Sequence, residues 1–271
     1  MPSNRKILEK LEQKLSARGC SPLTISSYLC VGRKFLAGVK NKIPTSDDVD
    51  KYIAKLRKAG QKDNSLRFNH YVISRLLKTI DVSLDEGPPK IREESIERPT
   101  FTIEEVMRLI EGSKTACDGQ QRAFLAASTT WGLRRAEIVS IRPGDIKNDT
   151  ILIRTKKSGI IRETLIPSEI KAHIAKYKWK DEVSLSRATT IFWQILYLCK
   201  FDLKKYNRYG WHSIRRFLVT SLMQTELKEF QISNFLRWKV SGTSMLYRYT
   251  HIPPADIDKE IYEVHPTLKL W

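Results

Sequence analysis

The segment at residues 81–98 constrains the fold of this chain most, because it interrupts a strongly helical pattern and divides the chain into two parts. A Gly-Pro-Pro run at residues 87–89 lies within it, and such a run cannot continue a helix. We therefore predict an N-terminal domain at residues 1–82, a linker at residues 83–99 and a second domain at residues 100–271. The 271 residues are enough for two domains that each bury a hydrophobic core.

The first domain is predicted to contain four helices. Ser21 followed by Pro22 is typical of a helix start, and Thr45 with Asp48 has nearly the spacing of a capping box. Apolar residues recur at helical spacing after these starts, which indicates a buried face on each helix. We expect the aromatic residues on these faces, including Tyr71, to belong to the core, and we assign no site to them.

The second domain is predicted to be mostly helical with an inserted hairpin. Residues 133–141 have a helical pattern, whereas residues 150–155 and 160–166 predict two strands. The Lys-Lys-Ser-Gly sequence at residues 156–159 suits a turn between them, and from residue 169 onward the pattern is helical again. The predicted fold class is therefore mainly α with a small antiparallel β-sheet.

The charge of the chain indicates a polyanionic partner. The chain has 48 Lys and Arg residues against 30 Asp and Glu residues, which leaves a net charge of +18. Such an excess is typical of proteins that bind nucleic acid, although a highly charged surface alone gives the same composition. No stretch of eighteen apolar residues occurs, so we expect no membrane span.

The cysteines and histidines indicate neither a disulfide framework nor a metal site. The cysteines lie far apart without CxxC spacing, and we interpret them as reduced core thiols of a cytoplasmic protein. The N-terminal residues are charged and amphipathic, unlike a secretory signal. The histidines show no metal-ligand spacing, so we expect no metal and no other cofactor. The four cysteines are Cys20, Cys30, Cys117 and Cys199.

Several residues of the second domain fit the cleavage of a DNA strand without a metal. Two arginines can bind the charged oxygens of a phosphodiester transition state through bidentate hydrogen bonds. A tyrosine nucleophile has an ordinary pKa of about 10, so neighbouring cations and a base must promote its ionisation. Arg134 and Glu137 are three residues apart, as are His212 and Arg215, which places each pair on one helical face.

The order of these residues resembles that of the tyrosine recombinase family, which includes phage integrases and Xer-type recombinases. That family shows a G-L-R-x-x-E motif, a lysine on a β-hairpin, an H-x-L-R motif, a histidine or tryptophan, and a tyrosine nine residues later. Here Gly132–Glu137 and His212–Arg215 correspond to the two motifs, and Tyr247 follows Trp238 by nine residues. Residues 21–28 also resemble part of the family's helical, SAM-like DNA-binding domain, so the resemblance covers nearly the whole chain.

The resemblance implies a role for each residue of these motifs. Arg134 and Arg215 would grip the scissile phosphate, and Glu137 would orient the first of them. His212 would assist proton transfer and hold the phosphate, while Trp238 would occupy the place of the family's third, often histidine, member. An indole N–H can donate a hydrogen bond there but cannot act as a base.

Two positions leave a choice. Lys157, in a K-S-G turn like the family's K-T-G, would protonate the leaving 5′ oxygen, with Lys156 as the alternative. Tyr247 has the family's spacing from Trp238, whereas Tyr249 begins a Y-T-H sequence that in the family usually starts at the nucleophile. We favour Tyr247, because helical geometry fixes the reach of a side chain more strictly than a following dipeptide does.

The chain also departs from the family pattern. Leu236 and Arg237 precede Trp238, where family members usually have Leu-Gly. Arg216 stands where many members have a second histidine after the H-x-L-R motif. These departures affect the placement of individual residues and leave the order of the motifs intact.

The resemblance further implies how the protein works on its partner. Four protomers, monomeric before they bind, would assemble on double-stranded DNA at specific recombination sites and exchange strands through a 3′-phosphotyrosine intermediate and a Holliday junction. We expect residues 253–271, with Ile257 and Ile261 at helical spacing, to dock on a neighbouring protomer. The alternatives are a type IB topoisomerase activity, which uses the same chemistry, and a noncatalytic DNA-binding relative.

Overall fold

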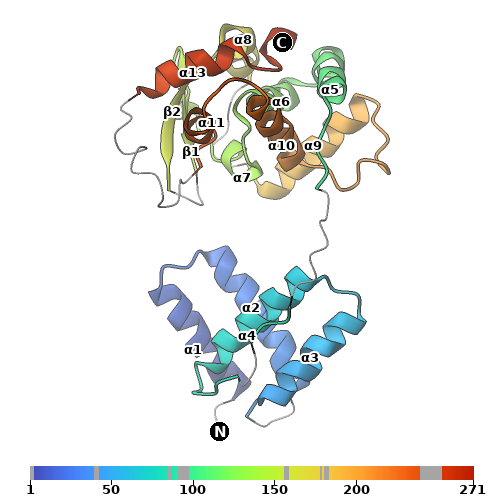
Figure 1. Ribbon diagram of the computed structural model, residues 1–271, viewed down its shortest axis with the longest axis vertical. Helices are drawn as coiled ribbons and strands as arrows, with labels where there is room; N and C mark the ends of the chain where they lie inside the picture. Colours follow the sequence, from blue (N-terminus) through green and yellow to red (C-terminus); the bar gives the residue numbers. More distant parts are fainter. Residues whose placement is uncertain are drawn as a thin grey trace. The chain divides into compact units, whose positions relative to one another are not determined.

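Helices make up almost all of the regular structure of this chain (Figure 1). The chain divides into two units, Met1–Ile96 and Glu97–Trp271. Among the described residues, no helix is both long enough and apolar enough to cross a membrane. The computed structural model describes residues 3–39, 43–84, 87–90, 98–155, 159–177, 179, 183–238 and 252–271.

Two of the four helices of the first unit begin at capping residues that the sequence predicted. The Ser21 Oγ accepts a hydrogen bond from the Thr24 amide at 3.2 Å, and Pro22 is the first residue of its helix. The Thr45 amide donates to the Asp48 carboxylate at 3.0 Å. Both predicted helix starts are confirmed. The helices are α1 (Asn4–Ala17), α2 (Pro22–Gly38), α3 (Ser46–Lys58) and α4 (Asp63–Leu77).

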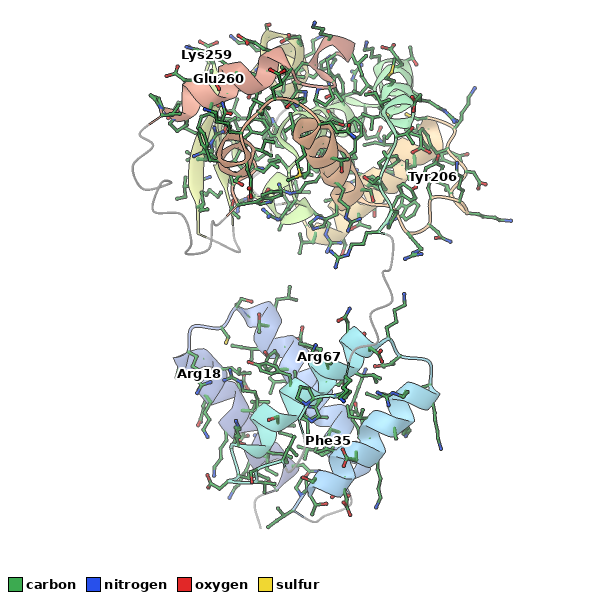
Figure 2. The ribbon with its side chains drawn as sticks, viewed as in Figure 1. Arg18, Phe35, Arg67, Tyr206, Lys259 and Glu260 are labelled. Atoms are coloured by element: carbon green, nitrogen blue, oxygen red, sulfur yellow. The ribbon has the colours of Figure 1, made fainter. Side chains whose placement is uncertain are left out.

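The apolar faces of these helices meet in a core. Phe35 of α2, labelled in Figure 2, is 1% exposed, and its ring packs edge-on against Tyr52 of α3 with 5.5 Å between centroids. Gly32 lets α1 approach α2 closely, because a Cβ at this position would lie 2.9 Å from the Leu8 Cδ2. Leu66 of α4 is completely buried, and each such leucine contributes about 1.5–3 kcal/mol by leaving water.

The second unit is built around α6. Its residues from Ala123 to Trp131 are all buried, and α5, α8, α9 and α10 pack around it. A helix that is buried on every side is mostly apolar, as this one is. The helices of the unit are α5 (Ile103–Ala116), α6 (Gly119–Trp131), α7 (Arg135–Ile138), α8 (Ser168–Lys176), α9 (Leu185–Leu198), α10 (Trp211–Met223), α11 (Glu229–Phe235) and α13 (Pro254–Glu263), with single 3-10 turns η1 (Pro143–Asp145) and η2 (Leu268–Leu270).

A two-stranded antiparallel sheet, β1 (Thr150–Arg154) and β2 (Ile161–Leu165), lies beside these helices. Thr150 pairs with Leu165 at one end and Arg154 with Ile161 at the other. Mainly α structure with one small antiparallel sheet is the predicted fold class, which is therefore confirmed.

Two sequence-based expectations for the second unit were wrong. The predicted helix at residues 133–141 is reduced to the four residues of α7, because Arg134 has an extended conformation (φ −73°, ψ 152°) and serves as its N-cap. Ile257 and Ile261, expected to face a neighbouring protomer, are 2% and 0% exposed in the core of their own unit. The outer side of α13 carries Lys259 and Glu260 instead (Figure 2).

The cysteines are free, but only two of them are core thiols. Cys117 and Cys199 are buried, whereas Cys30 is exposed and Cys20 is half-buried. The expectation of four core thiols was thus wrong for the first unit. Helical periodicity alone does not separate a cysteine at the edge of an apolar face from one at its centre.

Candidate active site

Glu137 is the centre of the candidate site. It lies on α7, its side chain is 2% exposed, and its Oε1 accepts a hydrogen bond from the Arg134 guanidinium at 2.6 Å. Its Oε2 accepts the Arg134 backbone N–H at 3.0 Å. The predicted pairing of Arg134 and Glu137 is confirmed. It forms because Arg134 is the N-cap of α7, and not because both residues lie on one face within a helix. The double contact fixes the Arg134 side chain relative to its own backbone.

Arg215 reaches the same carboxylate from α10. Its Nη1 lies 3.9 Å from the Glu137 Oε2, and its two Nη atoms donate to the carbonyls of Gly132 at 2.5 Å and Leu236 at 2.7 Å. Gly132 ends α6 in the left-handed region (φ 56°), and a Cβ there would lie 3.2 Å from Leu218 Cδ2. A glycine is therefore required where Arg215 binds. Two carbonyl contacts leave three of the five guanidinium N–H groups for other acceptors.

A third arginine completes the cluster. Arg237 follows α11, and its Nη2 donates to the Trp131 carbonyl at 2.9 Å and lies 3.4 Å from the Glu137 Oε2. The amides of Arg237 and Trp238 bond to the carbonyls of Asn234 at 3.0 Å and Ser233 at 2.9 Å, which is a Schellman ending of the helix.

The backbone conformation of Arg237 suits the glycine that the family pattern has at this position, and not an arginine. The Schellman ending requires a left-handed residue, usually glycine, and Arg237 has a φ of 55°. A side chain in this region costs about 1 kcal/mol or more. In the sequence, Arg237 stood out only as a departure from the family pattern, without a role.

Three guanidinium groups around one carboxylate leave an excess of positive charge at the site. Burial raises the pKa of Glu137, but Arg237, Arg134 and Arg215 together hold it below its usual range. Burial and the neighbouring arginines lower the pKa of Arg215 to about 9, so it stays charged at neutral pH. The cluster is suited to an anion, because a bound negative charge would offset the repulsion among the arginines.

A cleft of about 340 Å³ opens beside the cluster. Its lining includes His212, Arg215 and Trp238, so three of the predicted site residues share one cavity. Arg98 and Arg216 also line it, and neither was assigned a role from the sequence. The sequence contains one feature that could have indicated these two arginines, which is the excess of basic residues. The cleft is thus basic and open to an anionic ligand.

His212 lies at the first turn of α10, three residues before Arg215, and it is exposed. Partial burial and the nearby Arg215 and Arg216 lower the pKa of His212 below its ordinary value of 6.5. The imidazole is therefore neutral at pH 7 and can accept a proton. This is the protonation state that a general base needs.

Four of the residues considered from the sequence lie outside the described residues. They are Lys156 and Lys157, which lie between β1 and β2 in the sequence, and Tyr247 and Tyr249, which follow Trp238. The flanks of the turn are described: the Thr155 amide donates to the Ile160 carbonyl at 2.8 Å. Among the described residues no group of three His, Cys, Asp or Glu side chains could hold a metal ion.

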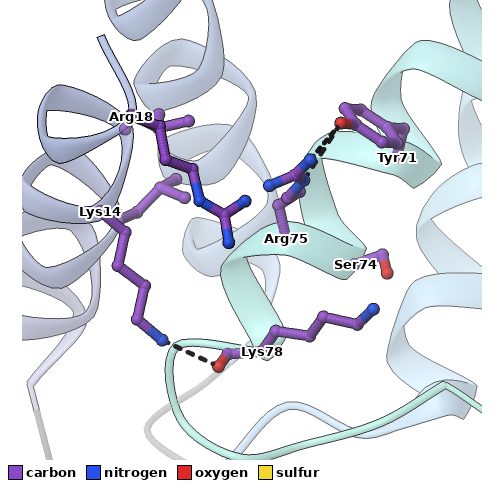
Figure 3. A pocket seen from close by; sticks show the side chains of 8 residues that line it. Lys14, Arg18, Tyr71, Ser74, Arg75 and Lys78 are labelled. Atoms are coloured by element: carbon purple, nitrogen blue, oxygen red, sulfur yellow. Dashed lines mark hydrogen bonds between the residues drawn. The ribbon is translucent and has the colours of Figure 1, made fainter. Parts of the chain in front are cut away.

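A second basic cleft lies in the N-terminal unit, between α1 and α4 (Figure 3). It has a volume of about 370 Å³, and among the described residues that line it none is acidic. The side chains of Arg18 and Arg75 reach into it, and Lys14 donates to the Lys78 carbonyl at 3.2 Å. Tyr71, expected in the core, is 44% exposed, and its hydroxyl accepts from Arg75 at 2.7 Å.

Known proteins were compared with the chain by sequence and by structure. No family model matches it. Tyrosine recombinase XerA of Saccharolobus solfataricus is 24% identical over 262 residues, which are 88% of this chain and 85% of the relative. A lambda integrase (75–356) dimer bound to a COC′ core site has a TM-score of 0.67 at 12% identity, over 92% of this chain and 98% of that one. XerH site-specific recombinase, in a post-cleavage complex with palindromic difH substrate, has a TM-score of 0.64 at 16% identity, over 98% of this chain and 84% of that one.

Proposed function

Because this chain is related in sequence to a tyrosine recombinase and has the fold of the tyrosine recombinases and integrases, we propose that it is a site-specific DNA recombinase. It cleaves and rejoins DNA strands through a 3′-phosphotyrosine intermediate. The observation that carries the proposal is the convergence of Arg134 and Arg215 on the buried Glu137, beside a cleft lined by His212 and Trp238.

The arginine cluster supports the first step of the reaction. The scissile phosphate carries one negative charge, and a second develops on its nonbridging oxygens as the nucleophile attacks. Arg134 and Arg215 hold these oxygens with N–H groups that their contacts to Glu137, Gly132 and Leu236 leave available. The guanidinium groups are fixed before the DNA arrives, so little reorganisation is needed in the transition state.

The proton and electron balance assigns the remaining roles. The phenolic oxygen of Tyr247 forms a bond to phosphorus, the bond from phosphorus to the 5′ oxygen breaks, and that oxygen receives a proton from Lys157. The phenolic proton passes to a neighbouring base, for which neutral His212 is the candidate. Trp238 donates its indole N–H to the phosphate. The phosphotyrosine bond conserves the energy of the phosphodiester, so the reverse reaction rejoins a strand without ATP.

DNA and other protomers are the proposed partners. The net charge of +18, the basic cleft between α1 and α4 and the basic cleft of the second unit all support binding to the DNA backbone. Four protomers on two sites, which exchange strands through a Holliday junction, would complete the reaction.

The test is a covalent-adduct assay. The protein is incubated with nicked suicide duplexes taken from the ends of the DNA element that encodes it, and the products are separated on a denaturing gel. We expect an adduct with wild-type protein and with Tyr249→Phe, and none with Tyr247→Phe. Loss only in Tyr249→Phe would keep the reaction and move the nucleophile. Binding without an adduct from any form would favour a noncatalytic relative, and relaxation of a supercoiled plasmid without strand exchange would favour a topoisomerase.

A further inference from the structure

Arg237 is buried where a residue of its type is least expected. Its side chain is 0% exposed, and its backbone adopts the left-handed conformation that favours glycine. Its Nη1 donates to the Phe235 carbonyl at 2.8 Å and its Nη2 to the Trp131 carbonyl at 2.9 Å. Desolvation of a guanidinium and a left-handed backbone are both unfavourable, so its contacts must offset them.

The contact that connects Arg237 to the candidate site is with Glu137. The Arg237 Nη2 lies 3.4 Å from the Glu137 Oε2, the same oxygen that accepts the Arg134 backbone N–H and faces Arg215 at 3.9 Å. Arg237 itself does not line the cleft, whereas the next residue, Trp238, does. A group in this place acts on the site through its neighbours and not by touching a substrate.

We propose that Arg237 is a positioning residue for phosphoryl transfer, which fixes the Glu137 carboxylate so that Arg134 and Arg215 are held for the scissile phosphate. The inference rests on the proposed function and deepens it. Two of the three arginines on Glu137 are thereby free to bind the phosphate. The third is dedicated to keeping the carboxylate in place.

The electrostatics of Glu137 support this division of labour. The charged and titratable groups that face it are Arg134 at the start of α7, Arg215 and His212 on α10, and Arg237 after α11. Burial raises the pKa of Glu137, whereas the charge of Arg237 and the two hydrogen bonds from Arg134 lower it. Without Arg237 the carboxyl would take up a proton at a higher pH. A protonated Glu137 would no longer hold two guanidinium groups.

A purely structural role is the competing explanation, because Arg237 also braces the ends of α6 and α11 through the Trp131 and Phe235 carbonyls. The two roles differ in their dependence on pH and on Glu137. If Arg237 only braces the two helix ends, its substitution would lower the free energy of unfolding at every pH. A residue that acts through Glu137 would move the acidic limb of the pH profile and would have no further effect once Glu137 is neutral.

The test measures the rate of adduct formation on the nicked suicide duplex between pH 5.5 and 8. For Arg237→Met we expect a loss of about tenfold to a hundredfold at neutral pH, as for a misplaced catalytic group, and an acidic limb displaced to higher pH. Arg237→Lys retains the charge, so the acidic limb of its pH profile should return towards that of the wild type. Arg108→Met is the matched control, because this guanidinium also donates to the carbonyls at a helix end, those of Cys199 and Lys200, outside the Glu137 cluster.

A double variant keeps the test decisive if Arg237→Met does not fold. Glu137→Gln combined with Arg237→Met removes both charges of a buried pair, which is better tolerated than removing one. We expect the double variant to be no slower than Glu137→Gln alone. An additive loss, or an unmoved acidic limb in Arg237→Met, would overturn the positioning role while the adduct of the wild type upheld the recombinase. A wild-type protein without an adduct would overturn both.

Discussion

Arg162 of β2 and Asp258 of α13 form an ion pair that is almost completely withdrawn from water. The Arg162 Nη2 lies 2.7 Å from the Asp258 Oδ1, and the two side chains are 5% and 0% exposed. The second Asp258 oxygen accepts the Leu165 amide at 2.9 Å. The pair therefore links α13 to the hairpin of the same unit, in addition to the burial of Ile257 and Ile261 in the core.

We predict that Asp258→Asn lowers the free energy of unfolding of the second unit by about 3–5 kcal/mol, because Arg162 would remain buried without its counter-charge. Asp256→Asn on the same helix is the control. Its exposed pair with Lys259 at 3.4 Å should contribute less than about 1 kcal/mol. Urea unfolding followed by tryptophan fluorescence measures the difference, since all 6 tryptophans lie in the second unit. Equal effects of the two substitutions would contradict the prediction.

Gly132→Ala should impair both stability and cleavage. The new Cβ would lie 3.2 Å from the Leu218 and Leu236 side chains and 3.5 Å from the Arg215 Cγ, at a φ of 56°. We expect a loss of about 2–3 kcal/mol in unfolding free energy and a strong reduction of the covalent adduct, because Arg215 must move. Gly119→Ala is the control: a Cβ there meets nothing within 4 Å, and its effect should stay within about 0.5 kcal/mol.

His265 should make the second unit sensitive to acid. Its Nδ1 accepts the Thr267 amide at 3.3 Å, so its Nε2 carries the proton and donates to the Thr130 carbonyl at 2.9 Å. Burial lowers its pKa from 6.5 to about 4. Between pH 6.5 and about 4, the His265 imidazole is therefore protonated in the unfolded chain and neutral in the folded chain. The stabilisation is complete above pH 6.5 and is lost as the pH falls towards 4.

The measurement compares urea unfolding of wild type and His265→Asn at pH 7 and pH 4.5. The wild type should lose roughly 2–3 kcal/mol more than the variant over this range. The variant is expected to be the less stable of the two at pH 7, because the Thr130 and Thr267 groups lose their partner. Parallel losses in both proteins would show that other groups account for the acid sensitivity.

The basic cleft of the first unit should contribute to DNA affinity. Arg18→Ala is expected to weaken binding to any duplex and to reduce the slope of log K against log salt by about 0.9, as for one lost phosphate contact. Arg5→Ala in α1, the helix that Arg18 directly follows, is the control, since this exposed guanidinium already pairs with Glu9 at 2.8 Å. Titrations by fluorescence anisotropy at several salt concentrations measure the slopes. Identical slopes for the two variants would exclude a phosphate contact at Arg18.

Local features of the sequence predicted the local structure. The capping residues Ser21 and Thr45 determine two helix starts, and the hairpin at β1 and β2 follows from two strand patterns joined by a turn sequence. These predictions succeed because caps and turns depend on hydrogen bonds between residues a few positions apart. The helix predicted at residues 133–141 failed because the pattern did not show that Arg134 is extended and donates its amide to the Glu137 carboxylate.

The helical character of the chain, its charge and the order of the motifs are visible in the sequence, since they depend on composition and on short-range spacing. The position of Arg237 beside Arg134 and Arg215 on one carboxylate is visible only in the folded molecule, because a Schellman turn 100 residues away from Glu137 in the chain brings it there. The tertiary structure also decided that α13 is held by Arg162 in its own unit. Contacts between distant residues depend on packing and on the pairing of buried charges, and neither is visible in a local pattern.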